Sequence, residues 1–231
     1  MDFRDRHVMV TGGTGALGGA VVALLLDAGA HCHVSYRHEA ETAALRLRPR
    51  TTLHSAADLS DEAVVAGLYN DVPALWASIH LAGGFAMASI GDTDKSTLLK
   101  QIETNFVSCF LCCRAATKTM IQTGHGGRIV NVAARPALEW RSGAGMTAYT
   151  ATKAAVAALT ASLAEEVAKD GILVNAVAPS IMDTPANRKA MPDADYAAWP
   201  KVEEVAATIA FLASPGNAVT RGGIVPVYGK A

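Results

Sequence analysis

The glycine-rich stretch V-T-G-G-T-G-A-L-G-G-A, which begins at Val10, constrains the fold of this chain more than any other feature. A short apolar run precedes it and a helical pattern follows it, which is the setting that a phosphate-binding turn requires. Gly12, Gly15 and Gly18 allow a tight turn, close approach of the backbone to an anion, and close packing of helix on sheet. Backbone N–H groups at the start of the helix then face a pyrophosphate. The alternative is an ordinary glycine-rich connection between a strand and a helix.

Short apolar runs alternate with longer helical patterns along all 231 residues, and no linker or low-complexity segment interrupts them. Several runs are continuously apolar, as expected for a parallel sheet covered by helices on both faces. The pattern predicts a single α/β domain over residues 1–231, with a doubly wound, seven-stranded parallel sheet flanked by helices. The expected strands are His7–Val10, His31–Tyr36, Thr52–Ala56, Ala77–Leu81, Arg128–Val132, Leu173–Val177 and Gly223–Val227. The expected helices are Leu17–Asp27, Asp61–Tyr69, Thr97–Thr123, Ala148–Lys169 and Glu203–Ala213.

Composition and charge exclude some classes of partner. Apolar residues make up 51% of the chain, enough for a sizeable core, and the formal net charge is −1 with scattered positive residues. We therefore expect no nucleic-acid or membrane partner. The first residues lack the layout of a secretory signal, and no apolar run approaches the roughly 18 residues of a membrane span. A soluble, cytoplasmic protein is the expectation.

The cysteines and histidines do not predict a metal site. Cys109, Cys112 and Cys113 lie in one apolar run, F-V-S-C-F-L-C-C-R, and no second cluster accompanies them. Small buried thiols on a helix are the simpler interpretation. His31 and His33 alternate on an expected strand and so point the same way, but no third ligand is evident. No metal is predicted.

The end of the second expected strand reads S-Y-R-H, with Tyr36 and Arg37 where a dinucleotide-binding fold often has an acid for the adenosine ribose. A carboxylate there repels a 2′-phosphate, whereas a guanidinium binds one. The missing acid and the available guanidinium favour NADP(H) over NAD(H). The alternative is that Arg37 is a solvated loop residue.

Several motifs, in order and at matching spacing, make the chain resemble the short-chain dehydrogenase/reductase family over essentially its whole length. The resemblance implies a Rossmann fold, a nicotinamide cofactor and hydride transfer to or from a small-molecule substrate. The matching segments are T-G-G-T-G-A-L-G at 11–18, A-D-L-S at 57–60, H-L-A-G-G at 80–84, E-T-N-F around Asn105, Y-T-A-T-K at 149–153, V-N-A-V-A-P-S-I-M-D-T at 174–184, and the tail G-G-I-V-P-V-Y-G.

The resemblance also implies which residues contact the cofactor. Ala16 stands where the middle glycine of the family loop is usual, and H-L-A-G-G replaces the usual N-N-A-G. The implied cofactor-binding residues are Gly12, Thr14, Gly15, Ala16, Leu17 and Gly18 in the loop, Tyr36 and Arg37 at the adenosine ribose, Asp58 and Leu59 at the adenine, Ala82, Gly83 and Gly84, Lys153 at the nicotinamide ribose, and Pro179, Ile181 and Thr184 beside the nicotinamide.

Tyr149 and Lys153 form the expected catalytic pair. Residues four apart on a helix share a face, so both side chains project toward one cleft. A free tyrosine has a pKa of about 10, and a cation within about 4–6 Å can lower it by roughly 1–3 units. Tyr149 then acts as acid or base at a substrate oxygen or nitrogen. The resemblance adds that Asn105 holds a water in a proton relay.

The serine that the family places after this strand is absent, because the chain reads Ala133–Ala134–Arg135 and Ala134 takes its place. The nearest hydroxyl downstream belongs to Ser142. Loss of such a donor costs roughly 2.7–4 kcal/mol, by analogy with an oxyanion-hole donor. Three alternatives follow. The substrate needs less activation, or Ser142 or another donor replaces the serine, or the protein binds the cofactor without catalysing a reaction.

The dihydropteridine reductase branch of the family resembles this chain where the serine is missing. The shared stretches are G-G-T-G-A-L-G, A-G-G before Phe85, A-R-P-A-L-E-W, and the long segment at 183–199. That branch reduces a quinonoid dihydropterin, a flat electrophile that needs a proton donor more than carbonyl polarisation. Trp140, Tyr196 and Trp199 are candidates to stack on a flat ring, with local loop packing as the alternative.

Two other functions stay open. Asn105 and the Tyr36–Arg37 pair suit general carbonyl reductases better than the pteridine branch, so a ketone or 3-oxoacyl reductase with a substitute for the serine is the second hypothesis. A non-catalytic NADP(H)-binding sensor or scaffold is the third. The presence of Tyr149 and Lys153 argues against it, since a sensor needs no poised phenol.

Two helices are apolar on more than one face. The patterns at 97–123 and 148–169 are rich in alanine and other apolar residues all round, although outer helices of a monomer normally have one polar face. We therefore expect these two helices to form the interface of a homo-oligomer, either a dimer or a tetramer.

Overall fold

Seven parallel strands form one sheet in the computed structural model, which describes residues 1–230. The strand order is β3-β2-β1-β4-β5-β6-β7, so the direction of winding reverses between β1 and β4, where open α/β sheets bind their ligands. The predicted doubly wound sheet is confirmed, and the strand ends differ by no more than two residues from those expected. The strands are β1 His7–Thr11, β2 His31–Tyr36, β3 Thr51–Ser55, β4 Leu75–His80, β5 Gly127–Val132, β6 Ile172–Pro179 and β7 Ile224–Val227.

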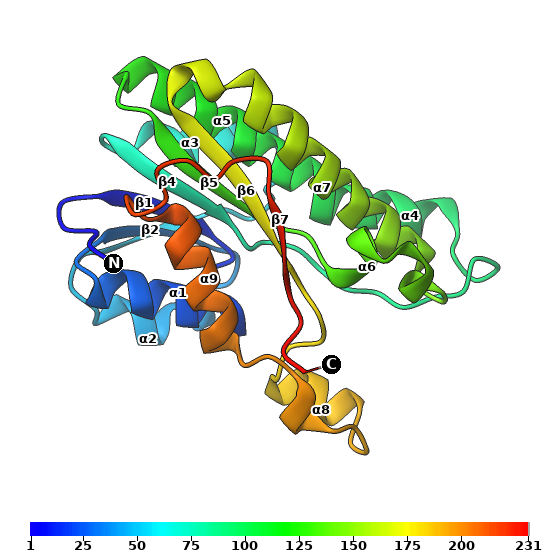
Figure 1. The fold of residues 1–231 in the computed structure, drawn as a ribbon. Coiled ribbons are helices and arrows are strands. Elements are labelled where there is room, and N and C mark those ends of the chain that lie inside the picture. Colours follow the sequence, from blue (N-terminus) through cyan, green and yellow to red (C-terminus); the bar gives the residue numbers. More distant parts are fainter. Residues whose placement is uncertain (231) are drawn as a thin grey trace.

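Helices cover both faces of the sheet (Figure 1). Successive strand residues point to opposite faces, so Val8 and Val10 enter one apolar cluster while Met9 between them enters the other. The first cluster is closed by α1 (Ala16–Asp27) and α9 (Val202–Ala213). The second is closed by α3 (Glu62–Asn70), α5 (Ser108–Thr123) and α7 (Thr147–Glu166). Burial on both faces explains why the strands read as continuous apolar runs.

The helix predicted over 97–123 is interrupted. It consists of α4 (Lys95–Ile102), a π-helical turn η2 (Glu103–Val107) and α5, and the N–H of Ser108 bonds to the carbonyl of Glu103 five residues back. A π-helical turn widens the helix and often marks a functional site. The apolar pattern does not reveal it, because one inserted residue hardly changes which face is buried.

Other differences from the predicted helices lie in the connections. The helix predicted over 148–169 ends at Glu166, and the 3₁₀ turn η4 (Ala168–Asp170) leads to Gly171, whose φ of 71° ends the helical path. The short elements not predicted are η1 (Glu39–Thr42), α2 (Ala43–Arg46), α6 (Arg135–Leu138), η3 (Trp140–Gly143), α8 (Pro185–Ala190) and η5 (Tyr196–Ala198).

The helices of residues 1–230 are either too short or too polar to cross a bilayer.

Candidate active site

The glycine turn packs as its sequence predicts. Gly12 has a φ of +68°, and a Cβ added there would lie 2.7 Å from the backbone nitrogen of Ala82. A Cβ on Gly18 would lie 2.2 Å from the carbonyl oxygen of Gly12. Gly15 precedes the first residue of α1, so the free N–H groups of that helix start beside the turn. Only glycine fits at Gly12 and Gly18, and the turn leaves its backbone open to an anion.

A cleft of about 450 Å³ lies at the carboxyl ends of the strands, beside this turn. Its walls contain predicted cofactor-binding residues from the connections that follow β1, β2, β3 and β4. These are Gly12, Thr14, Gly15, Tyr36, Arg37, Asp58, Leu59, Ala82 and Gly83. Residues not expected from the sequence also line it, namely Ser35, Glu41, Ala56, Ala57, Ser60, Leu81, Lys100, Glu103, Thr104 and Ser108. The extended, mostly uncharged cleft over a glycine turn fits a dinucleotide.

Glu41 is the unexpected residue with the most consequence, because its carboxylate faces the cleft. The hydroxyl of Thr14 donates a hydrogen bond of 3.0 Å to Glu41 Oε2. Hydrogen bonds from Ser60 lower the pKa of Asp58, and the charge of Arg37 adds to that effect. One end of the cleft therefore combines a guanidinium with two carboxylates.

Tyr149 and Lys153 lie together near the start of α7, as predicted. The Nζ atom of Lys153 is 5.9 Å from the centroid of the Tyr149 ring and donates a hydrogen bond of 2.8 Å to the carbonyl of Val132. Burial lowers the pKa of Lys153 to about 8. Burial raises the pKa of Tyr149 to about 12.

The expectation that Lys153 lowers the pKa of Tyr149 is therefore wrong for this arrangement. The ammonium group is turned toward a strand-end carbonyl, and the loss of water around the phenol dominates its pKa. Sequence spacing places the two residues on one helix face but does not set the direction of a four-carbon side chain.

Asn105 is buried in the π-helical turn and holds the loop that follows β4. Its Oδ1 accepts a hydrogen bond of 2.9 Å from the N–H of Gly84, and its Nδ2 donates one of 3.1 Å to Gln101. A Cβ on Gly83 would lie 2.8 Å from this Oδ1 and 3.6 Å from Lys153 Nζ. The small residue at Gly83 thus allows Asn105 and Lys153 to approach the same loop.

Ser142, the candidate to replace the missing serine at Ala134, is engaged elsewhere. Ala134 has extended backbone, is 8% exposed, and precedes α6. The hydroxyl of Ser142 donates a hydrogen bond of 2.7 Å to the carbonyl of Glu139, within its own loop. In this conformation Ser142 is engaged locally rather than replacing the serine.

An aromatic side chain from the loop after β4 packs on Tyr149. The ring of Phe85 packs edge-on against Tyr149, with ring centroids 5.0 Å apart and an angle of 83° between the planes. Phe85 is 62% exposed and Met87 is 68% exposed, and Ala88 forms a β-bridge with Met146, just before α7. The loop after β4 therefore places an aromatic ring against that of Tyr149 and leaves an exposed thioether two residues further on.

The three aromatic residues that were candidates to stack on a flat substrate ring differ in their exposure and contacts. Tyr196 and Trp199 pack on each other with centroids 5.1 Å apart, and the Tyr196 hydroxyl donates to the carbonyl of Pro192. These two residues serve local packing. Trp140 is 74% exposed, and its Nε1 donates to the carbonyl of Ala137.

The segment after β6 supplies the remaining predicted contacts. Pro179 ends the strand, Ile181 is exposed, and Thr184 begins α8 by accepting a hydrogen bond of 3.2 Å from the N–H of Asn187. The residues implied by resemblance that do not line the cleft are Ala16, Leu17, Gly18, Gly84, Lys153, Pro179, Ile181 and Thr184.

The cysteines are buried thiols, as predicted, but two of them have a histidine beside them that the sequence analysis did not identify. One nitrogen of His80, at the end of β4, and the sulfurs of Cys109 and Cys113 all lie within 4.8 Å of one another, and all three residues are buried. The sequence does not indicate His80 as a third potential ligand, because it lies 29 residues before Cys109. The two side chains come close only when β4 packs on α5.

Two further histidines lie beside His33, which the sequence analysis paired with His31. His7 on β1 and His54 on β3 lie on the same face of the sheet as His33, with N···N distances of 2.9 and 3.1 Å. The ring of His31 stacks on that of His7.

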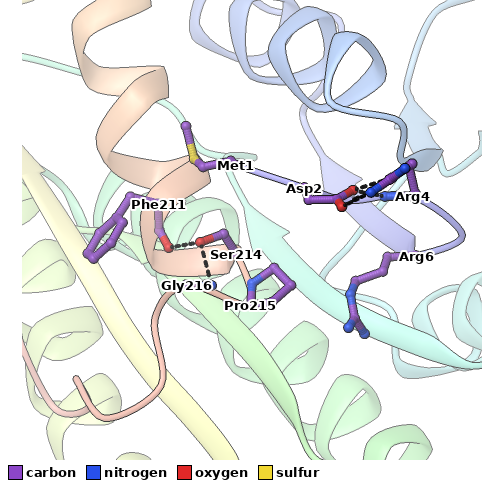
Figure 2. A pocket seen from close by; sticks show the side chains of 8 residues that line it. All are labelled: Met1, Asp2, Arg4, Arg6, Phe211, Ser214, Pro215 and Gly216. Carbon is purple, nitrogen blue, oxygen red and sulfur yellow. Dashed lines mark hydrogen bonds and ion pairs between the residues drawn. The ribbon is translucent and has the colours of Figure 1, made fainter.

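A second hollow lies between the N-terminal segment and the end of α9 (Figure 2). Asp2 and Arg4 pair across 2.6 Å there, and the hydroxyl of Ser214 donates to the carbonyl of Phe211. None of the predicted catalytic or cofactor-binding residues lines it.

Fold, glycine turn and Tyr–Lys pair together define a class of oxidoreductases that bind a nicotinamide dinucleotide. The model of the short chain dehydrogenase family matches residues 6–195, so the chain belongs to this family of oxidoreductases and uses a nicotinamide cofactor. Galactitol 2-dehydrogenase of Rhizobium johnstonii is 33% identical over 96% of this chain and 93% of its own. The 3-oxoacyl-acyl-carrier-protein reductase FabG of Rickettsia felis is 28% identical over 99% and 98%. The solved structure "ElxO with NADP Bound" is 25% identical, with a TM-score of 0.88 over 97% of each chain.

Proposed function

We propose that this protein reduces a flat, cyclic electrophile of the quinonoid dihydropterin type, with NADPH as the preferred reductant. The observation that carries the proposal is the setting of Tyr149. Its phenol lies beside Lys153 and the exposed edge of Phe85, while Ala134 stands where a carbonyl-polarising hydroxyl is expected. A substrate that regains a conjugated ring on reduction requires a proton but little help from an oxyanion donor.

The residues of this chain supply binding and a proton, and the bound nicotinamide supplies the hydride. Tyr149 keeps its proton at neutral pH, because burial raises its pKa to about 12, so the phenol is in the form that an acid requires. Lys153 is mostly protonated at neutral pH, with a pKa of about 8, and its charge favours the phenolate that remains after proton transfer. Asn105 fixes the loop of Gly83 and Gly84 against the cofactor side of the cleft.

The other contacts of the cofactor follow the family resemblance. The glycine turn and the start of α1 would hold the pyrophosphate, and Asp58 and Leu59 would hold the adenine. The segment from Pro179 to Thr184 would contact the nicotinamide.

A ketone or 3-oxoacyl thioester is the second candidate substrate. Two relatives favour it, since one is named a galactitol 2-dehydrogenase and the other a 3-oxoacyl reductase. The hydrogen bond from Ser142 to the carbonyl of Glu139 argues against it, because Ser142 is then not free to polarise a substrate carbonyl in place of the missing serine.

The experiment is a panel of NADPH and NADH oxidation rates with quinonoid dihydropterin, acetoacetyl thioester and simple ketones. Turnover of the pterin alone supports the proposal, and turnover of the thioester or ketones alone supports the second candidate. Cofactor binding without turnover of any of the three argues for a sensor or scaffold.

The preference for NADPH rests on Arg37, with Glu41 acting against it. Arg37→Ala should weaken NADPH binding much more than NADH binding, because only NADPH carries the 2′-phosphate. Glu41→Gln should tighten NADPH binding, since it removes a carboxylate from the same end of the cleft. Arg46→Ala is a matched control, because Arg46 pairs with Glu39 outside the cleft. Equal effects of Arg37→Ala on both cofactors would contradict the preference.

We also propose a homo-oligomer formed through residues 97–123 and 148–169. Phe110 and Ile121 on α5 are 44% and 48% exposed, and Ala158 and Ala161 are exposed on α7. Small side chains on one helix and large ones on the other suit close helix packing. Light scattering of Phe110→Glu against wild type tests it, with a shift toward monomer expected.

A further inference from the structure

Four potential metal ligands converge between β4, β5 and α5, behind the catalytic residues. They are Nδ1 of His80, the sulfurs of Cys109 and Cys113, and Oδ1 of Asn131. Oδ1 lies 2.8 Å from His80 Nδ1 and 3.4 Å from each sulfur, and the Cys113 sulfur lies 3.5 Å from His80 Nδ1. All four residues are buried, with exposures of 6% or less.

Three of these spacings are close to the edge lengths of a tetrahedron around a metal ion, and the Cys109 sulfur lies within 4.8 Å of the Cys113 sulfur and of a ring nitrogen of His80. Zn²⁺ binds sulfur at about 2.3 Å and nitrogen or oxygen at about 2.0–2.2 Å, so neighbouring ligands in a tetrahedral site are roughly 3.4–3.8 Å apart. Three of the measured distances, 3.4, 3.4 and 3.5 Å, fall at the lower end of that range. The shorter distance between His80 and Asn131 needs a small separation of the two side chains.

Without an ion, this arrangement crowds one oxygen. Asn131 Oδ1 is the acceptor for both thiols and for the His80 ring N–H, which gives three donors to an oxygen with two lone pairs. Replacing the three protons by one cation removes that crowding.

Groups behind the ligands hold them in the orientation that a metal requires. Asn131 Nδ2 donates a hydrogen bond of 2.9 Å to Thr160, which keeps Oδ1 turned toward the sulfurs. His80 Nε2 lies 2.8 Å from the hydroxyl of Ser78 and 3.2 Å from that of Tyr69. Hydroxyls donate or accept, so Nε2 can carry the proton and leave Nδ1 free to ligate. A polar partner on the second ring nitrogen is the usual support of a metal-bound histidine.

We propose that His80, Cys109, Cys113 and Asn131 bind one soft divalent cation of the Zn²⁺ type. Binding releases two thiol protons to solvent and moves the imidazole proton from Nδ1 to Nε2, so the centre of Zn²⁺ and two thiolates is neutral. Cys109 lies one helical turn after Asn105, and His80 lies two residues before Ala82. The ion therefore ties together the three elements that support the candidate active site.

Cobalt is the probe for this site, because thiolate-bound Co²⁺ gives intense sulfur-to-metal charge-transfer absorption. The untagged full chain is incubated with Co²⁺ under reducing conditions that do not chelate the metal, and a second sample is unfolded in urea and refolded with Co²⁺. One equivalent with charge-transfer bands and the visible bands of tetrahedral Co²⁺ is expected. With Zn²⁺ at about 100 times its Kd, the Tm should rise by roughly 5–10 °C.

Cys109→Ser and His80→Asn should each weaken the charge-transfer signal and remove the Tm shift, whereas Cys112→Ala should keep both. Cys112 is the matched control, because it is buried on the same helix but is not one of the four ligands. Cobalt bound only through the histidines of β1, β2 and β3 gives no sulfur band. The proposal is overturned if neither native nor refolded protein shows that band, or if Cys112→Ala loses it as fully as Cys109→Ser.

Discussion

Lys153 binds the carbonyl of Val132, at the end of β5, and not the phenolic oxygen of Tyr149. Its Nζ donates a hydrogen bond to the carbonyl of Val132 and lies 5.9 Å from the centroid of the Tyr149 ring. Burial moves the two pKa values in opposite directions, that of Tyr149 up to about 12 and that of Lys153 down to about 8. At neutral pH the phenol keeps its proton, and the amine holds its proton less firmly than a free lysine does. This suits the proposed role of Tyr149 as a proton donor.

Turnover should fall as the pH rises above about 8. The pKa of Lys153 is lowered to about 8, so its positive charge is present below that pH and lost above it. Without the charge, the phenolate left after proton transfer is less stable. A pH profile of kcat checks this. Lys153→Arg, whose guanidinium stays charged, should retain some activity and lose the alkaline limb, and an unchanged limb in this variant would contradict the assignment.

Tyr149→Phe should lower kcat by roughly 10²–10⁴, because general acid catalysis contributes about that factor. Cofactor affinity, measured by fluorescence titration, should stay near the wild-type value. Tyr196→Phe is the control, since the Tyr196 hydroxyl bonds only within its own loop. Full activity in Tyr149→Phe would show that the phenol is not the proton donor.

Gly18→Ala should weaken cofactor binding roughly tenfold or more, because the added Cβ would lie 2.2 Å from the Gly12 carbonyl and displace the pyrophosphate turn. Gly19→Ala, one residue later on α1, has no atom within 4 Å of the new Cβ and should bind cofactor normally. It should even stabilise the helix by about 1 kcal/mol. Equal Kd values for the two variants would contradict the close packing at Gly18.

Ala134→Ser should raise the rate with ketones and leave the rate with a quinonoid dihydropterin nearly unchanged. The hydroxyl restores a donor for a carbonyl oxygen, and such a donor contributes about 10²–10³ in rate. Ala133→Ser is the comparison, since Ala133 packs in a small apolar cluster with Ala137 and Ala178. A gain with the pterin as large as with ketones would argue against the proposed substrate class.

Acid should destabilise the fold through His33. Burial and the neighbouring histidines lower the pKa of His33 from 6.5 to about 4, while Asp71 opposes the shift. The folded protein then binds fewer protons than the unfolded chain between these values, so stability is complete above pH 6.5 and falls as the pH drops toward 4. The loss from this group is about 1–3 kcal/mol. Urea unfolding at several pH values measures it, and His33→Gln should flatten the dependence.

The predicted fold is confirmed because its signals are local. Strand–helix alternation, continuous apolar runs and the glycine turn each depend on a few neighbouring residues, and one right-handed way of winding them satisfies all three. The same holds for placing Tyr149 and Lys153 on one helix face, which needs only the period of the helix.

Tertiary structure alone decided three features of the site. It turned Lys153 toward Val132 and removed water from the Tyr149 phenol, which reversed the expected pKa shift. It brought Glu41 to the cleft beside Thr14. It also joined His80 to Cys109 and Cys113, which lie far from it in the sequence. Side-chain direction, desolvation and contacts between distant residues depend on how the elements pack, and a linear pattern carries no record of that packing.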